Sequence, residues 1–199
     1  MKERGKLIVL SGPSGAGKTT VVSKVMEKRD DICFSVSVTT RKPRPEEIDG
    51  KDYFFVDLDR FDEMVRNDEL LEHATYVANN YGTPREYVER KLEEGLNVVL
   101  DIEVQGALQI HEKMPDAVMV FVVPPSLEEL RRRLEGRGTE TARAIEARLI
   151  RAAQEYEEAV FYDWLVINDD ADCAADELSS IITASHCRFS DRKNVFEIE

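Results

Sequence analysis

Short, almost wholly apolar runs alternate along this chain with longer amphipathic stretches, a pattern that predicts alternating strands and helices. Four runs are almost wholly apolar, as strands buried on both faces of a parallel sheet should be: KLIVL from Lys6, NVVLDI from Asn97, AVMVFVV from Ala117 and WLVIN from Trp164. Amphipathic stretches between them predict helices over Val21 to Lys28, Val104 to Lys113, Ser126 to Glu135, Thr141 to Val160 and Ala171 to Ser185. The alternation predicts an α/β fold whose parallel sheet carries helices on both faces.

The segment from Phe34 to Glu94 interrupts this alternation. FSVSVTT alternates with period two and YFFV follows the turn residues GKD, so we expect a small half-exposed sheet, then helices at Asp59 to Asn67 and Arg85 to Glu94. The segment is too long for an ordinary loop. We therefore expect an inserted small α/β lobe at residues 34–95, at the edge of the sheet where α/β folds bind ligands. Residues 1–33 and 96–190 would form the core, and residues 191–199 a tail.

A glycine-rich segment with the spacing G-x-x-x-x-G-K-T follows the first apolar run. Glycines let the backbone curl so that successive N–H groups point at phosphate oxygens, and the helix behind them adds its positive end. A chance glycine-rich turn is the alternative, which the strand before and the helix after disfavour. The segment predicts a P-loop NTPase-type core, with Lys18 on the β and γ phosphates of a nucleotide and Thr19 as a Mg²⁺ ligand. The candidate phosphate-binding residues are Ser14, Gly15, Ala16, Gly17, Lys18, Thr19 and Thr20.

Charge and cysteine usage limit the possible partners and compartment. The 199 residues carry a net charge of −13, which disfavours binding to nucleic acid or to an anionic membrane. The three cysteines have no C-x-x-C pair, which is typical of reduced thiols. Because no apolar run approaches the roughly 18 residues that a membrane span needs, we expect a cytoplasmic protein. The sequence leaves open whether it is a monomer or a homo-oligomer.

The expected lobe contains the string SVTTRKPR, from Ser37 to Arg44. Arg41 and Arg44 lie three residues apart, and their guanidinium groups could hold one phosphate through paired hydrogen bonds. Taken alone, the string fits a solvated basic turn equally well.

Six segments in fixed order make this chain resemble the guanylate kinase family over about Lys6 to Ala184. They are GPSGAGKTT, SVTTRKPR, DGKDYFFV, EHATYVANNYG, DIEVQGA and RRRLEGRGTET. The resemblance implies Mg²⁺-dependent transfer of the ATP γ-phosphate to GMP, giving ADP and GDP. It places the acceptor phosphate on Arg41, Arg44, Tyr53 and Tyr81, and guanine on Ser37, Glu72 and Thr83, with Glu103 nearby.

Base chemistry independently favours Glu72 as the residue that selects guanine. Guanine presents its N1–H and N2–H₂ donors side by side, and one carboxylate can accept both, whereas adenine has an acceptor at N1. Without its neighbours, Glu72 would be interpreted as an exposed acid at a helix end. Two positions depart from the commonest family pattern, because Glu103 stands where aspartate is usual and Thr83 where serine is frequent. The longer side chain leaves open whether Glu103 contacts the base directly.

The resemblance also assigns residues to the metal, the lid and the adenine. Asp101 resembles the Walker B aspartate that orients Mg²⁺ beside Thr19, although a strand-end aspartate can also cap the next helix. Residues from about 126 to 150 resemble a helical lid, with Arg137 and Arg148 as transition-state contacts and Arg133 as a further candidate. Asn168 lies where the family's adenine loop lies, or is a simple turn residue.

Three classes of function remain open at this stage. A guanylate-specific kinase is favoured. A non-catalytic guanylate-kinase-like module that binds proteins should have lost the P-loop lysine or the lid arginines, yet Lys18, Arg137 and Arg148 are all present. A P-loop kinase for another small acceptor would have no reason to keep Ser37 together with Glu72.

Overall fold

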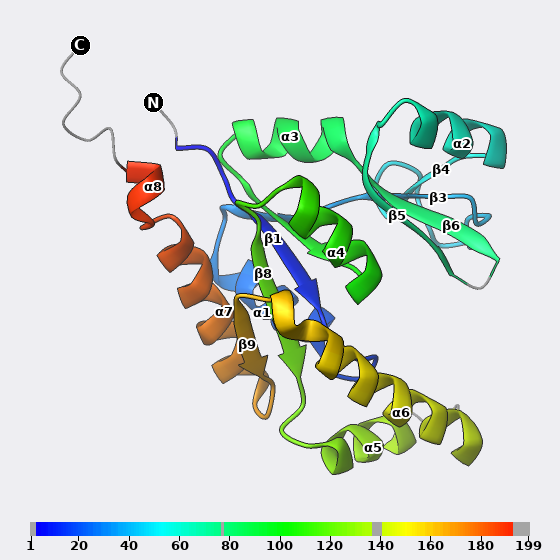
Figure 1. Cartoon of the computed structure of the whole chain (residues 1–199), viewed down its shortest axis with the longest axis vertical. Helices are drawn as coiled ribbons and strands as arrows, with labels where there is room; N and C mark the ends of the chain where they lie inside the picture. The colour runs from blue at the N-terminus through cyan, green and yellow to red at the C-terminus, as the bar shows by residue number, and fades with distance from the viewer. Residues whose placement is uncertain (1–2, 77, 137–140, 193–199) are drawn as a thin grey trace. The chain divides into compact units, whose positions relative to one another are not determined.

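The computed structural model describes residues 3–76, 78–136 and 141–192, and these divide into two compact units (Figure 1). Unit 1 comprises residues 1–9 and 31–117, and unit 2 comprises residues 10–30 and 118–199. Strand β1 (Leu7–Ser11) crosses the boundary between them. The chain is a mixed α/β protein in which a parallel sheet with the strand order β2-β7-β1-β8-β9 is flanked by helices, as the sequence predicts.

Unit 1 contains the whole of a four-stranded sheet and part of the five-stranded parallel sheet. Its elements are β2 (Ile32–Phe34), β3 (Ser37–Thr39), β4 (Tyr53–Phe55), α2 (Leu58–Arg66), β5 (Leu70–Tyr76), β6 (Asn79–Pro84), α3 (Arg85–Glu93), β7 (Asn97–Asp101) and α4 (Val104–Lys113). Strand β2 pairs with β7 in parallel, and β4-β3-β6-β5 form a separate four-stranded sheet. In that sheet β3 pairs with β4 in parallel, while β6 is antiparallel to both β3 and β5.

A small apolar core holds helix α2 to the four-stranded sheet. Phe61 and Met64 project from α2 and pack with Val38 of β3 and Leu70 of β5. Asp57 begins the helix by accepting a hydrogen bond from the backbone N–H of Arg60 at 2.8 Å, as an N-cap residue should. This packing gives β3 and β5, which carry candidate site residues, a fixed support.

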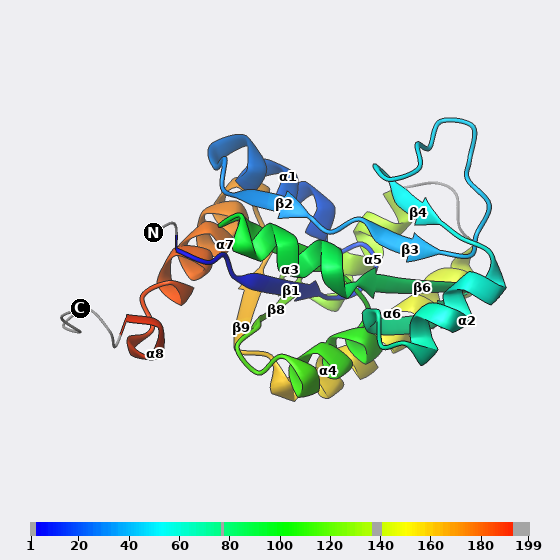
Figure 2. The same ribbon diagram turned by 90° about the horizontal axis from the view of Figure 1, so that it is seen from above.

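Unit 2 contains the P-loop and the candidate lid. Its elements are α1 (Lys18–Lys28), β8 (Val118–Val123), α5 (Leu127–Gly136), α6 (Ala142–Glu158), the 3₁₀ turn η1 (Ala159–Phe161), β9 (Trp164–Ile167), α7 (Ala171–Ser185) and α8 (Phe189–Arg192). Strands β8 and β9 pair in parallel from Val120 opposite Trp164 to Val123 opposite Ile167. Helices α1 and α7 lie side by side (Figure 2), joined by the ion pairs Lys24–Asp172 and Lys28–Asp176.

Helices α5 and α6 pack on each other through a core of their own. Leu130 and Leu134 of α5 are buried against Ile145 and Leu149 of α6. Ser126 caps α5 by accepting a hydrogen bond from the N–H of Glu129 at 3.0 Å, which is the start that the sequence predicts. These two helices form most of the segment expected to be a lid, and their packing fixes the arginines that each carries relative to the other.

Three parts of the sequence expectation need correction or extension. Residues 70–84 form the β5–β6 hairpin, which the sequence does not predict, and the short strand β2 is also unexpected. Helix α1 begins at Lys18 rather than at Val21. In the described part of the chain, no helix is both long and apolar enough to cross a membrane.

Candidate functional site

The P-loop of unit 2 is organised around the carbonyl group of Ala16. The side-chain Nδ2 of Asn168 donates to this oxygen at 2.7 Å, from a residue that lies 152 positions further along the chain. Gly17 next to it has φ of 87°, in the left-handed region that favours glycine, and a Cβ there would lie 2.3 Å from Asn168 Nδ2. Glycine is therefore favoured at position 17 both by the backbone angle and by the close approach of Asn168.

Three basic side chains gather at this P-loop. Lys18 Nζ donates to the carbonyl oxygen of Gly12 at 2.6 Å, and Arg148 Nη1 of α6 donates to Ser14 Oγ at 2.6 Å. Arg133 of α5 donates from Nη2 to the carbonyl oxygen of Asn168 at 2.8 Å. The structure thus brings together Lys18, Arg133 and Arg148, which the sequence assigns to phosphoryl transfer, and Arg137 lies outside the described residues.

Arg133 is held in place by an acid on its own helix. Its Nε donates to Glu129 Oε1 at 2.7 Å, and Arg132 shares the same carboxylate. The two guanidinium groups hold the pKa of Glu129 at about 2, well below its usual range. Arg131 pairs instead with Glu146, and the side chain of Arg132 is 77% exposed, so both lie on the surface.

Asn168 has a different role in the structure from a simple turn residue. It is buried, its side chain holds the P-loop through Ala16, and its backbone N–H donates to Val123 at 2.7 Å. Its contact with the adenine of ATP remains a prediction. The sequence gives no signal for its contact with Ala16, because the two residues are far apart along the chain.

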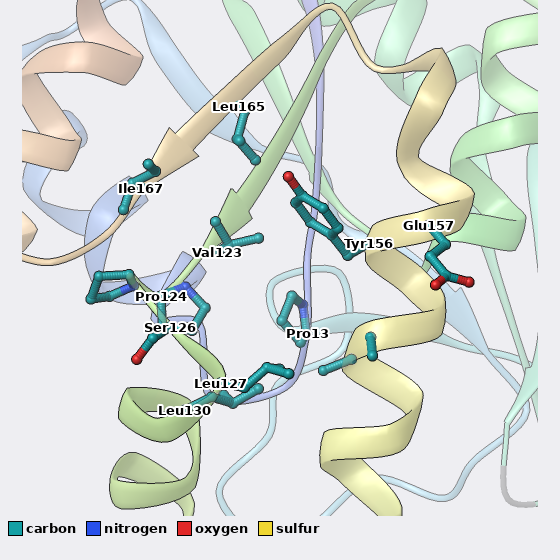
Figure 3. Close-up of a pocket in the computed structure, with 13 residues that line it drawn as sticks. Pro13, Val123, Pro124, Ser126, Leu127, Leu130, Tyr156, Glu157, Leu165 and Ile167 are labelled. Atoms are coloured by element: carbon teal, nitrogen blue, oxygen red, sulfur yellow. The ribbon is translucent and has the colours of Figure 1, made fainter.

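A hollow of about 380 Å³ on unit 2 does not suit a triphosphate (Figure 3). It lies beside β9, α5 and α6, and its lining includes Leu127, Leu130, Leu165 and Ile167. Among the described residues, Glu157 is the only charged side chain that lines it. A polyanion needs cations around it, so we place the phosphates of a donor at the P-loop and not here.

In unit 1, residues from two strands and a loop lie together at the candidate phosphate site. Ser37 and Tyr53 face each other in the β3–β4 register, and Thr39 pairs with Tyr81 of β6. The rings of Tyr53 and Tyr81 lie 6.1 Å apart at their centroids, and the guanidinium of Arg41 lies 5.3 Å from the Tyr53 ring. Arg41, Tyr53 and Tyr81 are therefore neighbours, as the sequence expectation requires.

Glu47 organises this cluster, and sequence reasoning missed it. Its carboxylate accepts hydrogen bonds from Nη1 and Nη2 of Arg41 at 2.9 and 2.7 Å, and another from the backbone N–H of Arg44 at 2.7 Å. The Arg41 guanidinium and the Arg44 N–H lower the pKa of Glu47 to about 2. The sequence offers one indication of this role, an acid three residues after Arg44 in a turn flanked by prolines. Such a pattern is too common to assign a role to the acid.

Glu72 is the buried acid of unit 1. It lies on β5 with 5% of its surface exposed, so the alternative of an exposed helix-end acid is wrong. Thr83 Oγ1 of β6 donates to Glu72 Oε1 at 2.7 Å. Burial raises the pKa of Glu72, while the Thr83 hydrogen bond and the charge of Lys113 oppose that shift. The structure thus brings together two of the predicted guanine-reading residues.

A pocket of about 370 Å³ in unit 1 joins several predicted residues. Ser37, Tyr53 and Asp101 are among the side chains that line it. Asp101 ends β7 and is exposed, and Glu103 is exposed at the N-cap position of α4. Lys51 supplies a positive charge in the lining. The lining also includes Asp52, so the pocket combines Lys51 with the carboxylates of Asp52 and Asp101.

Comparisons with known proteins identify the family of this chain. The sequence model of the guanylate kinase family matches residues 4–185. The chain belongs to the guanylate kinase family. It is 55% identical over 188 residues to a guanylate kinase of Lactococcus lactis subsp. lactis, covering 94% of this chain and 92% of that one.

A further relative and a solved structure also resemble this chain. A guanylate kinase of Bacillus cereus is 50% identical over 186 residues, which are 93% of this chain and 91% of that protein. The crystal structure of guanylate kinase from Anaplasma phagocytophilum superposes with a TM-score of 0.73 at 38% identity, covering 94% of this chain and 89% of that one. Family membership therefore rests on sequence and on fold alike.

Proposed function

We propose that this guanylate kinase family member transfers the γ-phosphate of ATP to GMP, giving ADP and GDP, with the residues described above in defined roles. The single observation that carries the assignment of roles is the buried Glu72 carboxylate bonded to Thr83, in a chain with a complete P-loop. A carboxylate is costly to bury unless a partner compensates it. One oxygen has Thr83, and the donors of a guanine base would satisfy the group further.

Guanine selection follows from the acceptor character of Glu72. The N1–H and N2–H₂ groups of guanine both donate in the same direction, so one carboxylate can accept both. Adenine presents an acceptor at N1, which the carboxylate would repel. Ser37 and the Thr83 hydroxyl add hydrogen-bonding groups on neighbouring strands. We assign Glu103 to the same region, as the family resemblance implies.

The acceptor phosphate is assigned to Arg41, Arg44, Tyr53 and Tyr81. Guanidinium groups match the oxygens of a phosphate through paired hydrogen bonds, and phenol hydroxyls add donors. Glu47 keeps Arg41 in one orientation before GMP binds. Because the side chain is already ordered, less conformational entropy is lost when the phosphate arrives.

The donor phosphates are assigned to the P-loop, with Arg133 and Arg148 as contacts in the transition state. The attacking group is a phosphate oxygen that is largely ionised near neutral pH, since the second pKa of a phosphomonoester is about 6. A general base is therefore unnecessary, and the barrier is the approach of two polyanions. Lys18, Arg133 and Arg148 address that barrier by placing positive charge beside the transferred group.

Phosphoryl transfer of this kind requires a divalent metal, and we propose Mg²⁺. Thr19 and Asp101 are both exposed and offer the oxygen donors that Mg²⁺ prefers. Among the described residues no group of three acidic, histidine or cysteine side chains could hold a metal alone. That donor set fits Mg²⁺, which keeps several waters and binds substrate phosphates rather than a complete protein cage. When bound, the ion would neutralise charge on the transferring phosphates.

A competition assay among acceptors tests this assignment. Phosphoryl transfer from ATP would be measured with GMP, AMP, UMP and CMP for the wild-type chain, for Glu72→Gln, and for Glu86→Gln as a matched control at an exposed position of α3. We expect GMP preference in the wild type and a loss of about 1 to 3 kcal/mol of GMP-over-AMP selectivity in Glu72→Gln, the scale of one paired base contact. An unchanged ratio of kcat/KM in Glu72→Gln would show that another residue reads guanine.

A further inference from the structure

Helix α4 contacts the strand that carries Glu72 at two adjacent points. Gly106 lies against the side chain of Glu72, because a Cβ at that glycine would be 2.6 Å from Glu72 Oε2 and 3.3 Å from its Cδ. Gln109 forms two hydrogen bonds with the backbone of the next residue: its Nε2 donates to the His73 carbonyl oxygen at 2.9 Å, and its Oε1 accepts from the His73 N–H at 3.2 Å.

These two contacts come from one face of the helix. Residues three apart on an α-helix lie on the same side, so Gly106 and Gln109 face β5 together. Strand β5 is at the edge of the four-stranded sheet, where no further strand of the described residues pairs with its outer backbone groups. The Gln109 amide supplies the donor and the acceptor that such a strand would have supplied at His73.

We propose that Gly106 and Gln109 are positioning residues for guanine selectivity, acting through Glu72. Gln109 fixes the position of β5, and the missing side chain at Gly106 leaves the space that Oε2 of Glu72 occupies. The other oxygen is held by Thr83, so the carboxylate lies between a strand on one side and a helix on the other. This inference rests on the proposed role of Glu72 in reading guanine.

The requirement for glycine at position 106 has no explanation in helix formation. Gly106 is the third residue of α4, it is buried, and its φ is not in the left-handed region. Alanine is the better helix former at such a position. Glycine at this position makes the helix less stable than alanine would. The structure shows what the glycine provides instead, which is space for the Glu72 carboxylate.

The variant Gly106→Ala separates positioning from stability. Its methyl group must displace the Glu72 carboxylate, since the backbone of α4 is fixed by Gln109 and by buried neighbours such as Val104 and Ala107. We expect KM for GMP to rise about tenfold or more, the scale of a displaced base contact. We expect KM for ATP and kcat at saturating GMP to change little, and the melting temperature not to fall.

Two further variants identify the route of the effect. Glu72→Asp shortens the side chain by one methylene, so the double variant Gly106→Ala/Glu72→Asp should be less impaired than the sum of the two single changes predicts. Gln109→Ala removes only the bridge to His73 and should raise KM for GMP with the same sparing of KM for ATP. Glu112→Ala, at an exposed position of the same helix, is the matched control and should behave as wild type.

The outcomes distinguish the positioning role of Gly106 and Gln109 from the guanine-reading role of Glu72. If Glu72→Gln loses GMP-over-AMP selectivity while Gly106→Ala and Gln109→Ala keep it, the positioning role is wrong and the role of Glu72 stands. If Glu72→Gln also keeps its selectivity, the guanine-reading assignment itself has failed. Should Gly106→Ala not fold, as judged by circular dichroism, Gln109→Ala decides the question alone, and an unchanged KM for GMP in it overturns the proposal.

Discussion

Replacing Asn168 by alanine should damage both the stability of the chain and its use of ATP. Asn168 is 4% exposed, and its Nδ2 donates to the Ala16 carbonyl oxygen at 2.7 Å. Without this donor, the same oxygen keeps only Arg133 Nη1 at 3.5 Å from the contacts described for it. The P-loop would therefore lose a short side-chain hydrogen bond to its Ala16 carbonyl group.

The size of the effect follows from the cost of an unsatisfied buried carbonyl group. Such a group costs about 1–3 kcal/mol. In a chain of this size each kcal/mol lowers the melting temperature by about 2–4 °C, so we expect Asn168→Ala to melt about 2–12 °C below the wild type. Asn168→Asp should be at least as unstable, because it points an anionic acceptor at the acceptor oxygen of Ala16.

Thermal unfolding and steady-state kinetics together provide the assay. KM for ATP should rise about tenfold, since a P-loop displaced by a fraction of an ångström aims its N–H groups away from the phosphates. Asp169→Ala is the control. The Asp169 side chain is next to Asn168 in the chain but is exposed, so its removal should change the free energy of unfolding by no more than about 0.5 kcal/mol. The reasoning is refuted if Asn168→Ala unfolds at the wild-type temperature with an unchanged KM for ATP.

Three other predictions concern single side chains. Lys18→Ala should lower kcat and kcat/KM together by about 10² or more, because Lys18 acts mainly on the charge of the transition state, and unchanged turnover in the folded variant would contradict the P-loop assignment. Glu47→Gln should raise KM for GMP about three- to tenfold by releasing Arg41, whereas a fall in KM would show that the carboxylate competes with the phosphate. Because burial raises the pKa of Glu72, its carboxylate should be protonated at a higher pH than that of an ordinary glutamate, so KM for GMP should rise as the pH falls. Glu72→Gln should lack this part of the pH profile, and identical profiles for the two proteins would exclude Glu72 as the titrating group.

Elements whose signals are local follow the sequence prediction closely. Helices α4 and α7 begin and end at the predicted residues, and the apolar run from Asn97 does form a buried strand. Helix α7 shows the reason, since Asp170 caps it through hydrogen bonds from the N–H groups of Asp172 and Cys173 at 2.9 Å each. Apolar periodicity and a capping residue are both contained in a short stretch of chain, so one sequence is enough to detect them.

The β5–β6 hairpin escaped prediction because tertiary contacts stabilise it against its own composition. β6 contains asparagine, glycine and proline, which are depleted in strands. Ala78 next to the strand has φ of 64°, an angle that alanine seldom adopts, so no asparagine–glycine turn signal marks the reversal. Pairing with β3 on one side and packing against α4 on the other supply the stability that the local sequence lacks.

The same distinction separates the two halves of the candidate site. The P-loop could be predicted because its glycines, Lys18 and Thr19 act within one short segment. The proposed guanine-reading residue, Glu72, could not be located from a local motif, because its setting arises from contacts across the fold. Thr83 on the next strand bonds Glu72, and Gly106 on a separate helix leaves room for it. A buried carboxylate with one oxygen bonded and the other against a glycine has no motif of its own. Its function depends on where three elements place it, and a single sequence does not contain that information in any local pattern.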